Sequence, residues 1–172
     1  MRRLVPALLA TVILVVANPA SALGLDLNVV VGADLGGEFS TDVSIDSATG
    51  YTLGLELMFE VPVVELGVGA EYGFERSAQD TDADVSYVNV YAVGRLNFIG
   101  PLYAVARFGY SDLSADAIGD LSVDGGTSWS AGLGLKFFDR LRVEALFNRL
   151  SGSVDDQDLD YETWSLRVMW TF

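Results

Sequence analysis

Hydrophobic residues occupy every second position in eight segments of this chain. From Tyr51 to Phe59, each odd position is Tyr, Leu or Phe, and the even positions between them are Thr, Gly, Glu and Met. The same period recurs in residues 25–34, 65–74, 88–98, 102–110, 128–137, 141–148 and 162–172. Side chains of a β-strand point alternately to its two faces, so this period predicts eight strands, each with one apolar face.

The connections between these segments alternate in length. Three are tight, at residues 60–62, 99–101 and 138–140, whereas the other four are long and rich in Asp, Ser, Thr and Gly. Short turns at one rim and long loops at the other are typical of an up-and-down barrel that crosses the outer membrane. The sequence therefore predicts an all-β fold: an eight-stranded antiparallel up-and-down transmembrane β-barrel with short periplasmic turns and four longer extracellular loops.

A soluble barrel with an apolar interior would show the same alternation, so the placement of the aromatic residues decides between the two. One group lies beside the long loops: Tyr51, Tyr72, Phe74, Phe108, Tyr110, Trp129, Phe147 and Trp164. A second group lies beside the short turns or the C-terminus: Phe59, Phe98, Phe137, Trp170 and Phe172. Two aromatic bands separated by Leu, Val and Ala match the two interfaces of a bilayer, which favours an apolar face turned outward to lipid. The Gly, Ser and Asn of the other face suit a narrow lumen.

The N-terminal residues follow a different pattern. Two arginines precede a short apolar run, and a small-residue triplet stands at 20–22. This order is typical of a secretory signal peptide, and the apolar run is short for a spanning helix. We expect residues 1–22 to be a cleaved signal peptide and residues 23–172 to form the outer-membrane β-barrel domain.

Composition narrows the functional classes. The chain has 172 residues and a net charge of −14, and it contains neither cysteine nor histidine. These absences exclude disulfides, thiol nucleophiles, Ser-His-Asp catalysis and histidine metal sites. The acidic balance argues against nucleic acid, because phosphate binding needs a basic surface. We expect a protein that is not an enzyme, with no catalytic residues, no metal site and no cofactor.

The C-terminal segment carries a family resemblance. It ends in Phe172, with apolar residues at the alternate positions Leu166, Val168 and Trp170. With this segment, and with the phrase Gly-Pro-Leu-Tyr at 100–103, the chain resembles the small eight-stranded outer-membrane barrels of Gram-negative bacteria, the OmpA-like and OmpX-like proteins. The resemblance covers the whole mature chain. It implies a Gram-negative outer-membrane location, contact with outer-membrane lipid and lipopolysaccharide, and recognition of the C-terminal strand by the barrel-assembly machinery.

The inward face of the predicted barrel carries charges of both signs. The set comprises Glu56, Glu65, Glu71, Glu144, Arg95, Arg107, Lys136, Arg142 and Arg167. Counted from the short-turn rim, Glu56, Arg95, Arg107, Glu144 and Arg167 fall at similar heights. Buried charges need partners, and an eight-stranded barrel leaves little internal space. We predict a structural ion-pair network that fills the lumen, and the alternative is a conducting path.

Acidic residues concentrate in the predicted loops. Residues 80–84 alternate Asp with small residues as in a calcium loop, but Val85 and Tyr91 stand where an EF-hand requires Gly and Glu. An EF-hand is therefore rejected. A loose divalent site that bridges loop carboxylates to lipopolysaccharide phosphates is an alternative to a solvated acidic rim.

The leading functional hypothesis is a non-enzymatic integral outer-membrane protein. It would act in envelope structure or in surface contacts, such as adhesion, through its acidic extracellular loops. One alternative is a small porin-like channel for ions or small solutes. A second is an outer-membrane lipid-modifying enzyme, which the absence of histidine disfavours because the enzymes that resemble this barrel rely on it. The loops themselves indicate no particular ligand.

Overall fold

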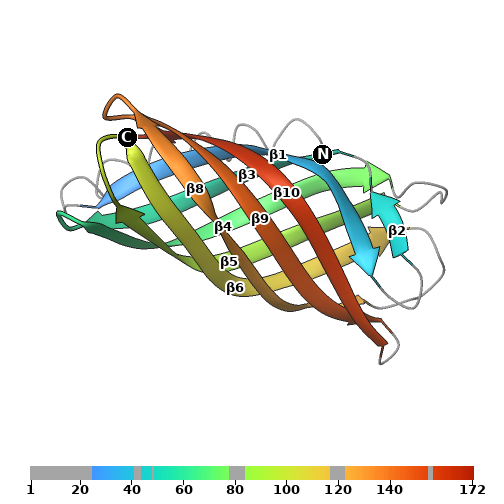
Figure 1. The fold of residues 1–172 in the computed structure, drawn as a ribbon. Coiled ribbons are helices and arrows are strands. Elements are labelled where there is room, and N and C mark those ends of the chain that lie inside the picture. Colours follow the sequence, from blue (N-terminus) through green and yellow to red (C-terminus); the bar gives the residue numbers. More distant parts are fainter. Residues whose placement is uncertain (1–24, 41–43, 48, 78–83, 117–122, 155–156) are drawn as a thin grey trace, which may run out of the picture.

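The structure, a computed structural model, describes residues 25–40, 44–47, 49–77, 84–116, 123–154 and 157–172 (Figure 1). In this part of the chain the eight long strands are β1 (Asp26–Ser40), β3 (Gly50–Glu60), β4 (Val64–Ser77), β5 (Asp84–Asn97), β6 (Leu102–Asp116), β8 (Gly126–Phe137), β9 (Leu141–Val154) and β10 (Gln157–Thr171). Within the same residues, no helix has the length and apolar character needed to cross a bilayer. The predicted signal peptide lies outside the described residues.

Each long strand pairs antiparallel with the strand that follows it around the wall, and β10 returns to β1. At this closing seam Asn28 lies opposite Thr171, and Val31 lies opposite Val168. The wall is therefore closed, and the strands run steeply tilted around a common axis (Figure 1). The predicted eight-stranded antiparallel barrel is confirmed.

Two short strands and several strand extensions were not predicted. β2 (Ser44–Ser47) pairs with β1, and β7 (Val123–Asp124) pairs with β9. At the loop end, β6 continues to Asp116 and β10 begins at Gln157, both beyond the alternating segments. Beyond the aromatic band both faces of a strand meet a polar environment, so a ladder can continue there without any apolar alternation.

The outward face is apolar, whereas the inward face carries the buried charges together with apolar side chains such as Met58 and Leu146. Val68 and Phe108 are 59% and 65% exposed on the outer wall, whereas Glu56 and Glu144 on the inner wall are fully buried. A water-soluble barrel would have the opposite arrangement, with its apolar side chains inside. The exposed wall therefore suits hydrocarbon, as the aromatic banding predicted.

Inward-facing tyrosines pack across glycines of the adjacent strand. The pairs are Tyr91 with Gly69, Tyr87 with Gly73, and Tyr103 with Gly134. A Cβ atom at any of these glycines would lie 2.2–2.6 Å from the nearest ring atom. Glycine is required at these positions because the ring occupies the space that any side chain would need.

Candidate functional site in the barrel interior

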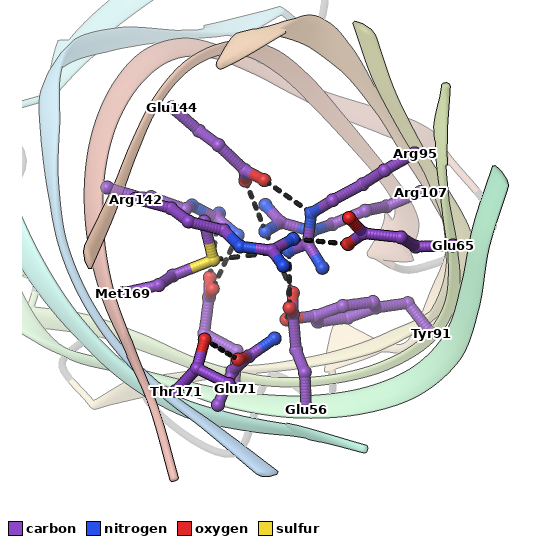
Figure 2. A network of polar contacts seen from close by, with 12 residues as sticks. Glu56, Glu65, Glu71, Tyr91, Arg95, Arg107, Arg142, Glu144, Met169 and Thr171 are labelled. Carbon is purple, nitrogen blue, oxygen red and sulfur yellow. Dashed lines mark hydrogen bonds and ion pairs between the residues drawn. The ribbon is translucent and has the colours of Figure 1, made fainter. Parts of the chain in front are cut away.

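Four charged side chains meet on the barrel axis and form the central ring (Figure 2). Arg95 Nη2 lies 2.5 Å from Glu56 Oε2, and its Nε lies 2.8 Å from Glu144 Oε1. Arg107 Nη2 lies 2.8 Å from Glu56 Oε1 and 2.6 Å from Glu144 Oε2. No side chain of the ring is more than 3% exposed. Each arginine thus bridges both glutamates, and each glutamate bridges both arginines.

The same three-residue arrangement holds both glutamates. On neighbouring strands, Glu56, Gly69 and Tyr91 lie directly opposite one another across β3, β4 and β5. Tyr91 Oη donates to Glu56 Oε1 at 3.1 Å. The glycine leaves room for the tyrosine ring to lean across it, and the phenol then reaches the carboxylate two strands away.

The second copy of this arrangement lies on β6, β8 and β9. Tyr103 lies opposite Gly134, which lies opposite Glu144. Tyr103 Oη donates to Glu144 Oε1 at 3.1 Å. Each carboxylate of the ring is therefore bonded to a tyrosine as well as to the arginines. Each arginine also lies over a ring, with Arg107 Cζ 5.2 Å from the Tyr91 centroid and Arg95 Cζ 5.9 Å from the Tyr103 centroid.

A second layer lies toward the short turns. Arg142 pairs with Glu65, and its Nη2 lies 2.8 Å from Glu60 Oε1. Lys136 Nζ lies 3.9 Å from the same Glu60 oxygen and is 34% exposed. Arg142 is buried with its partner, whereas Lys136 belongs to the solvated rim.

A third layer lies toward the loops. Arg167 Nη1 lies 2.6 Å from Glu71 Oε2, and its Nη2 lies 2.9 Å from Glu71 Oε1. Tyr87 Oη lies 3.0 Å from the same Glu71 oxygen and 3.3 Å from Asp34 Oδ2. Between this layer and the central ring, a cavity of about 10 Å³ is lined by Glu71, Arg107, Asn148 and Arg167 among others. A cavity of this size holds about one water molecule.

The sequence of residues 7–172 matches the family model described as the outer membrane protein beta-barrel domain. The chain belongs to this family. Comparison with curated protein sequences finds no match. The family is one of outer-membrane proteins, which agrees with the lipid-facing wall and with the Gram-negative outer-membrane location expected from the sequence.

Solved structures of small outer-membrane barrels share this fold. Neisserial surface protein A superimposes with a TM-score of 0.59 at 16% identity, covering 87% of this chain and 97% of that chain. Ail of Yersinia pestis has a TM-score of 0.58 at 14% identity, with 87% and 99% covered. OprG of Pseudomonas aeruginosa has a TM-score of 0.55 at 9% identity, with 86% and 95% covered. The predicted resemblance to small outer-membrane barrels is confirmed, and at these identities it is a likeness of fold.

The structure places the charged residues singled out from the sequence on the inward face, in separate layers. Of the five expected at one height, four form the central ring, and Arg167 instead pairs with Glu71. Arg95 and Arg107 already occupy both oxygens of Glu144, the residue directly opposite Arg167 on β9. Arg167 instead reaches toward the loops and contacts both oxygens of Glu71.

Sequence reasoning missed the tyrosines and two acidic members of these layers. Tyr91 and Tyr103 occupy inward positions of the alternating pattern, so the sequence showed that their side chains point into the lumen. The spacing did not show which carboxylates they would contact. Glu60 falls in a predicted turn and Asp34 at the end of a predicted strand. β1 continues past Asp34 to Ser40, and β3 ends with Glu60, so both residues belong to strands that line the lumen.

The C-terminal strand closes the wall. Leu166, Val168, Trp170 and Phe172 are each 44–51% exposed on its outward face. The amide of Phe172 donates to the carbonyl of Leu27 at 2.9 Å, so the last residue takes part in the closing seam. Recognition of this strand by the assembly machinery stays a prediction.

The described residues offer no obvious chemistry beyond charge pairing. Among them, no group of three or more His, Cys, Asp or Glu side chains is placed to hold a metal ion. The predicted loop residues 80–83 lie outside the described part. The two arginines and two glutamates of the central ring form four buried ion pairs, which tyrosines flank. Together they form a rigid plug across the lumen.

Proposed function

We propose that this protein is a non-conducting, non-enzymatic outer-membrane barrel that contributes to envelope structure and presents its acidic loops for contacts at the cell surface. The observation that carries the proposal is the central ring. It joins opposite walls of the lumen through four ion pairs whose side chains are almost fully buried.

A permanent path for ions would have to pass through this ring. An ion crossing it must separate at least one arginine from one of its carboxylates, and a buried ion without its partner costs several kcal/mol. The adjacent layers, Arg142 with Glu65 and Arg167 with Glu71, add two further barriers of the same kind. A plugged lumen leaves the loops as the surface on which the protein can act.

The negative charge of the loops favours some classes of partner over others. Acidic residues outnumber basic residues by 24 to 10 in the chain, and the sequence concentrates them in the loops. Ail, an attachment invasion locus protein of the same fold, has been solved with the heparin analogue sucrose octasulfate, a polyanion. Acidic loops would repel such a ligand, so basic or neutral partners suit this surface better. Outer-membrane lipid, lipopolysaccharide and the assembly machinery are proposed as the partners of the wall.

Planar-bilayer recording tests the closed lumen. The wild-type barrel, checked for folding by its shift in electrophoretic mobility on boiling, is expected to insert without discrete conductance steps. An outer-membrane porin recorded in the same bilayers provides the positive control. Reproducible single-channel steps from the folded wild type would contradict the proposal and favour the channel alternative.

A further inference from the structure

Three aromatic side chains form a continuous surface on the outward wall of β8, β9 and β10. The ring of Trp129 lies 5.6 Å from that of Phe147, which lies 5.5 Å from that of Trp164. Trp129 and Trp164 are 41% and 60% exposed. All three belong to the aromatic band beside the long loops, so they lie at the outer interface of the membrane.

A charged cluster continues this surface toward the loops. Arg149 lies opposite Trp129 on one side and Glu162 on the other. Its Nη2 lies 2.6 Å from Asp160 Oδ2, and its Nη1 lies 3.3 Å from Glu162 Oε1. Ser151 Oγ donates to Asp160 Oδ1 at 2.7 Å. Asp160 thus accepts hydrogen bonds from both Arg149 and Ser151.

Stability alone gives little reason for these charges. The side chains of Arg149, Asp160 and Glu162 are 28–41% exposed, and an ion pair this exposed adds little to folding. Membrane anchoring does not require them either, because the three aromatic rings already provide an interfacial anchor. Donors and acceptors held in place beside flat apolar rings are instead the features of a binding surface.

The chemistry of this surface selects a sugar. A pyranose has an apolar C–H face that packs on an aromatic ring and a rim of hydroxyls that both donate and accept hydrogen bonds. Asp160 and Glu162 accept, and the guanidinium of Arg149 has N–H groups beyond those in its two ion pairs. Two carboxylates against one cation leave the cluster negative, which disfavours a bare phosphate.

We propose that the outer-wall cluster, made of Trp129, Phe147, Trp164, Arg149, Asp160 and Glu162, binds the sugar headgroup of a glycolipid in the outer leaflet. The sugar ring packs against Trp164 and Phe147, and its hydroxyls bond to the charged side chains above. The cluster faces sideways into the leaflet, at headgroup height, so a membrane glycolipid reaches it more readily than a soluble glycan. The inference rests on the outer-membrane location and not on the closed lumen.

Retention of lipid by the full-length folded chain tests the proposal. The protein, in detergent micelles, is mixed with rough lipopolysaccharide, with the same lipopolysaccharide after dephosphorylation, or with phosphatidylglycerol, and retained lipid is counted by native mass spectrometry. Trp164→Leu and Arg149→Gln probe the cluster. The matched controls are Phe137→Leu, on the same face of β8 as Trp129 at the opposite interface, and Arg140→Gln, in a short turn.

The wild type and both controls are expected to retain phosphorylated and dephosphorylated lipopolysaccharide alike. Each cluster variant should retain about tenfold less, the effect of one or two lost hydrogen bonds or a lost ring contact. The mobility shift on boiling confirms folding, and Glu162→Gln replaces any variant that does not fold.

Three results would overturn the proposal. They are retention that requires the phosphates, equal retention of phosphatidylglycerol, and cluster variants that behave like the wild type. Binding of the free core oligosaccharide as tightly as the intact glycolipid would overturn the assignment to the leaflet. None of these results bears on conductance, so this proposal and the closed lumen fail independently.

Discussion

Replacing Glu144 by alanine is expected to lower the free energy of unfolding by about 3–5 kcal/mol, the usual cost of removing one partner from a buried ion pair. Arg95 and Arg107 would then share Glu56 alone, which leaves two buried guanidinium charges facing one carboxylate. The hydroxyl of Tyr103 would also lose its acceptor. The measurement is urea-induced unfolding of the barrel in lipid vesicles, followed by the mobility difference between folded and unfolded chain.

Glu60→Ala is the matched control, because Glu60 also belongs to the lumen layers but is 40% exposed at the rim. Its partner Arg142 keeps Glu65, so the expected loss is about 1 kcal/mol or less. Equal losses for Glu144→Ala and Glu60→Ala would show that burial of the ring adds nothing to its strength.

A compensated double variant separates charge balance from the presence of charge. Arg107→Met with Glu144→Leu removes one cation and one anion, and it leaves Arg95 and Glu56 as a matched pair at 2.5 Å. Because apolar replacement of a whole buried pair is often neutral, most of the stability lost in Glu144→Ala should return. A double variant as unstable as the single one would mean that the ring's shape, and not its charge balance, holds the walls together.

The fold was predictable because one physical constraint acts on every residue of the wall. Each strand meets hydrocarbon on one side and a narrow lumen on the other, so residues such as Leu55 and Glu56 had to alternate. The turns also follow from this constraint, because a chain that has crossed the apolar band must reverse its direction to cross it again. Outside the aromatic bands the constraint ends, and there the sequence did not reveal β2, β7 or the extended ends of β6 and β10.

The lumen was predictable in composition but not in pairing. Alternation shows that Arg95, Arg107 and Arg167 all point inward, but counting residues from one rim ignores the stagger between tilted strands. Long side chains then choose among carboxylates by competition. Glu144 accepts two arginines and so leaves Arg167 to Glu71, a result that depends on the full set of distances and not on any one spacing.

The glycines of the wall differ in how much space surrounds them. Gly132 and Gly94 both lie within strands, but the alternation places Gly132 on the inward face of β8 and Gly94 on the outward face of β5. A Cβ atom on Gly132 would lie 2.0 Å from the backbone oxygen of Ala145 and 2.9 Å from Leu146 Cα, whereas one on Gly94 would meet only Leu66 Cδ2, at 3.6 Å. The first glycine is required by the approach of a neighbouring strand, and the second faces open space on the lipid side.

Gly132→Val is therefore expected to prevent most molecules from forming the closed barrel. The free energy of unfolding should fall by about 3 kcal/mol or more, because the backbone, and not a flexible side chain, would have to move. Gly94→Val should fold as well as the wild type or slightly better, since valine favours strands and its methyl groups would face hydrocarbon. The folded fraction after refolding into vesicles, read from the mobility shift on boiling, measures both. If strand propensity decided the outcome, both valines would help. If the spacing of β8 and β9 decides it, only Gly94→Val will fold, and the inward glycines then set how closely the walls approach around the central ring.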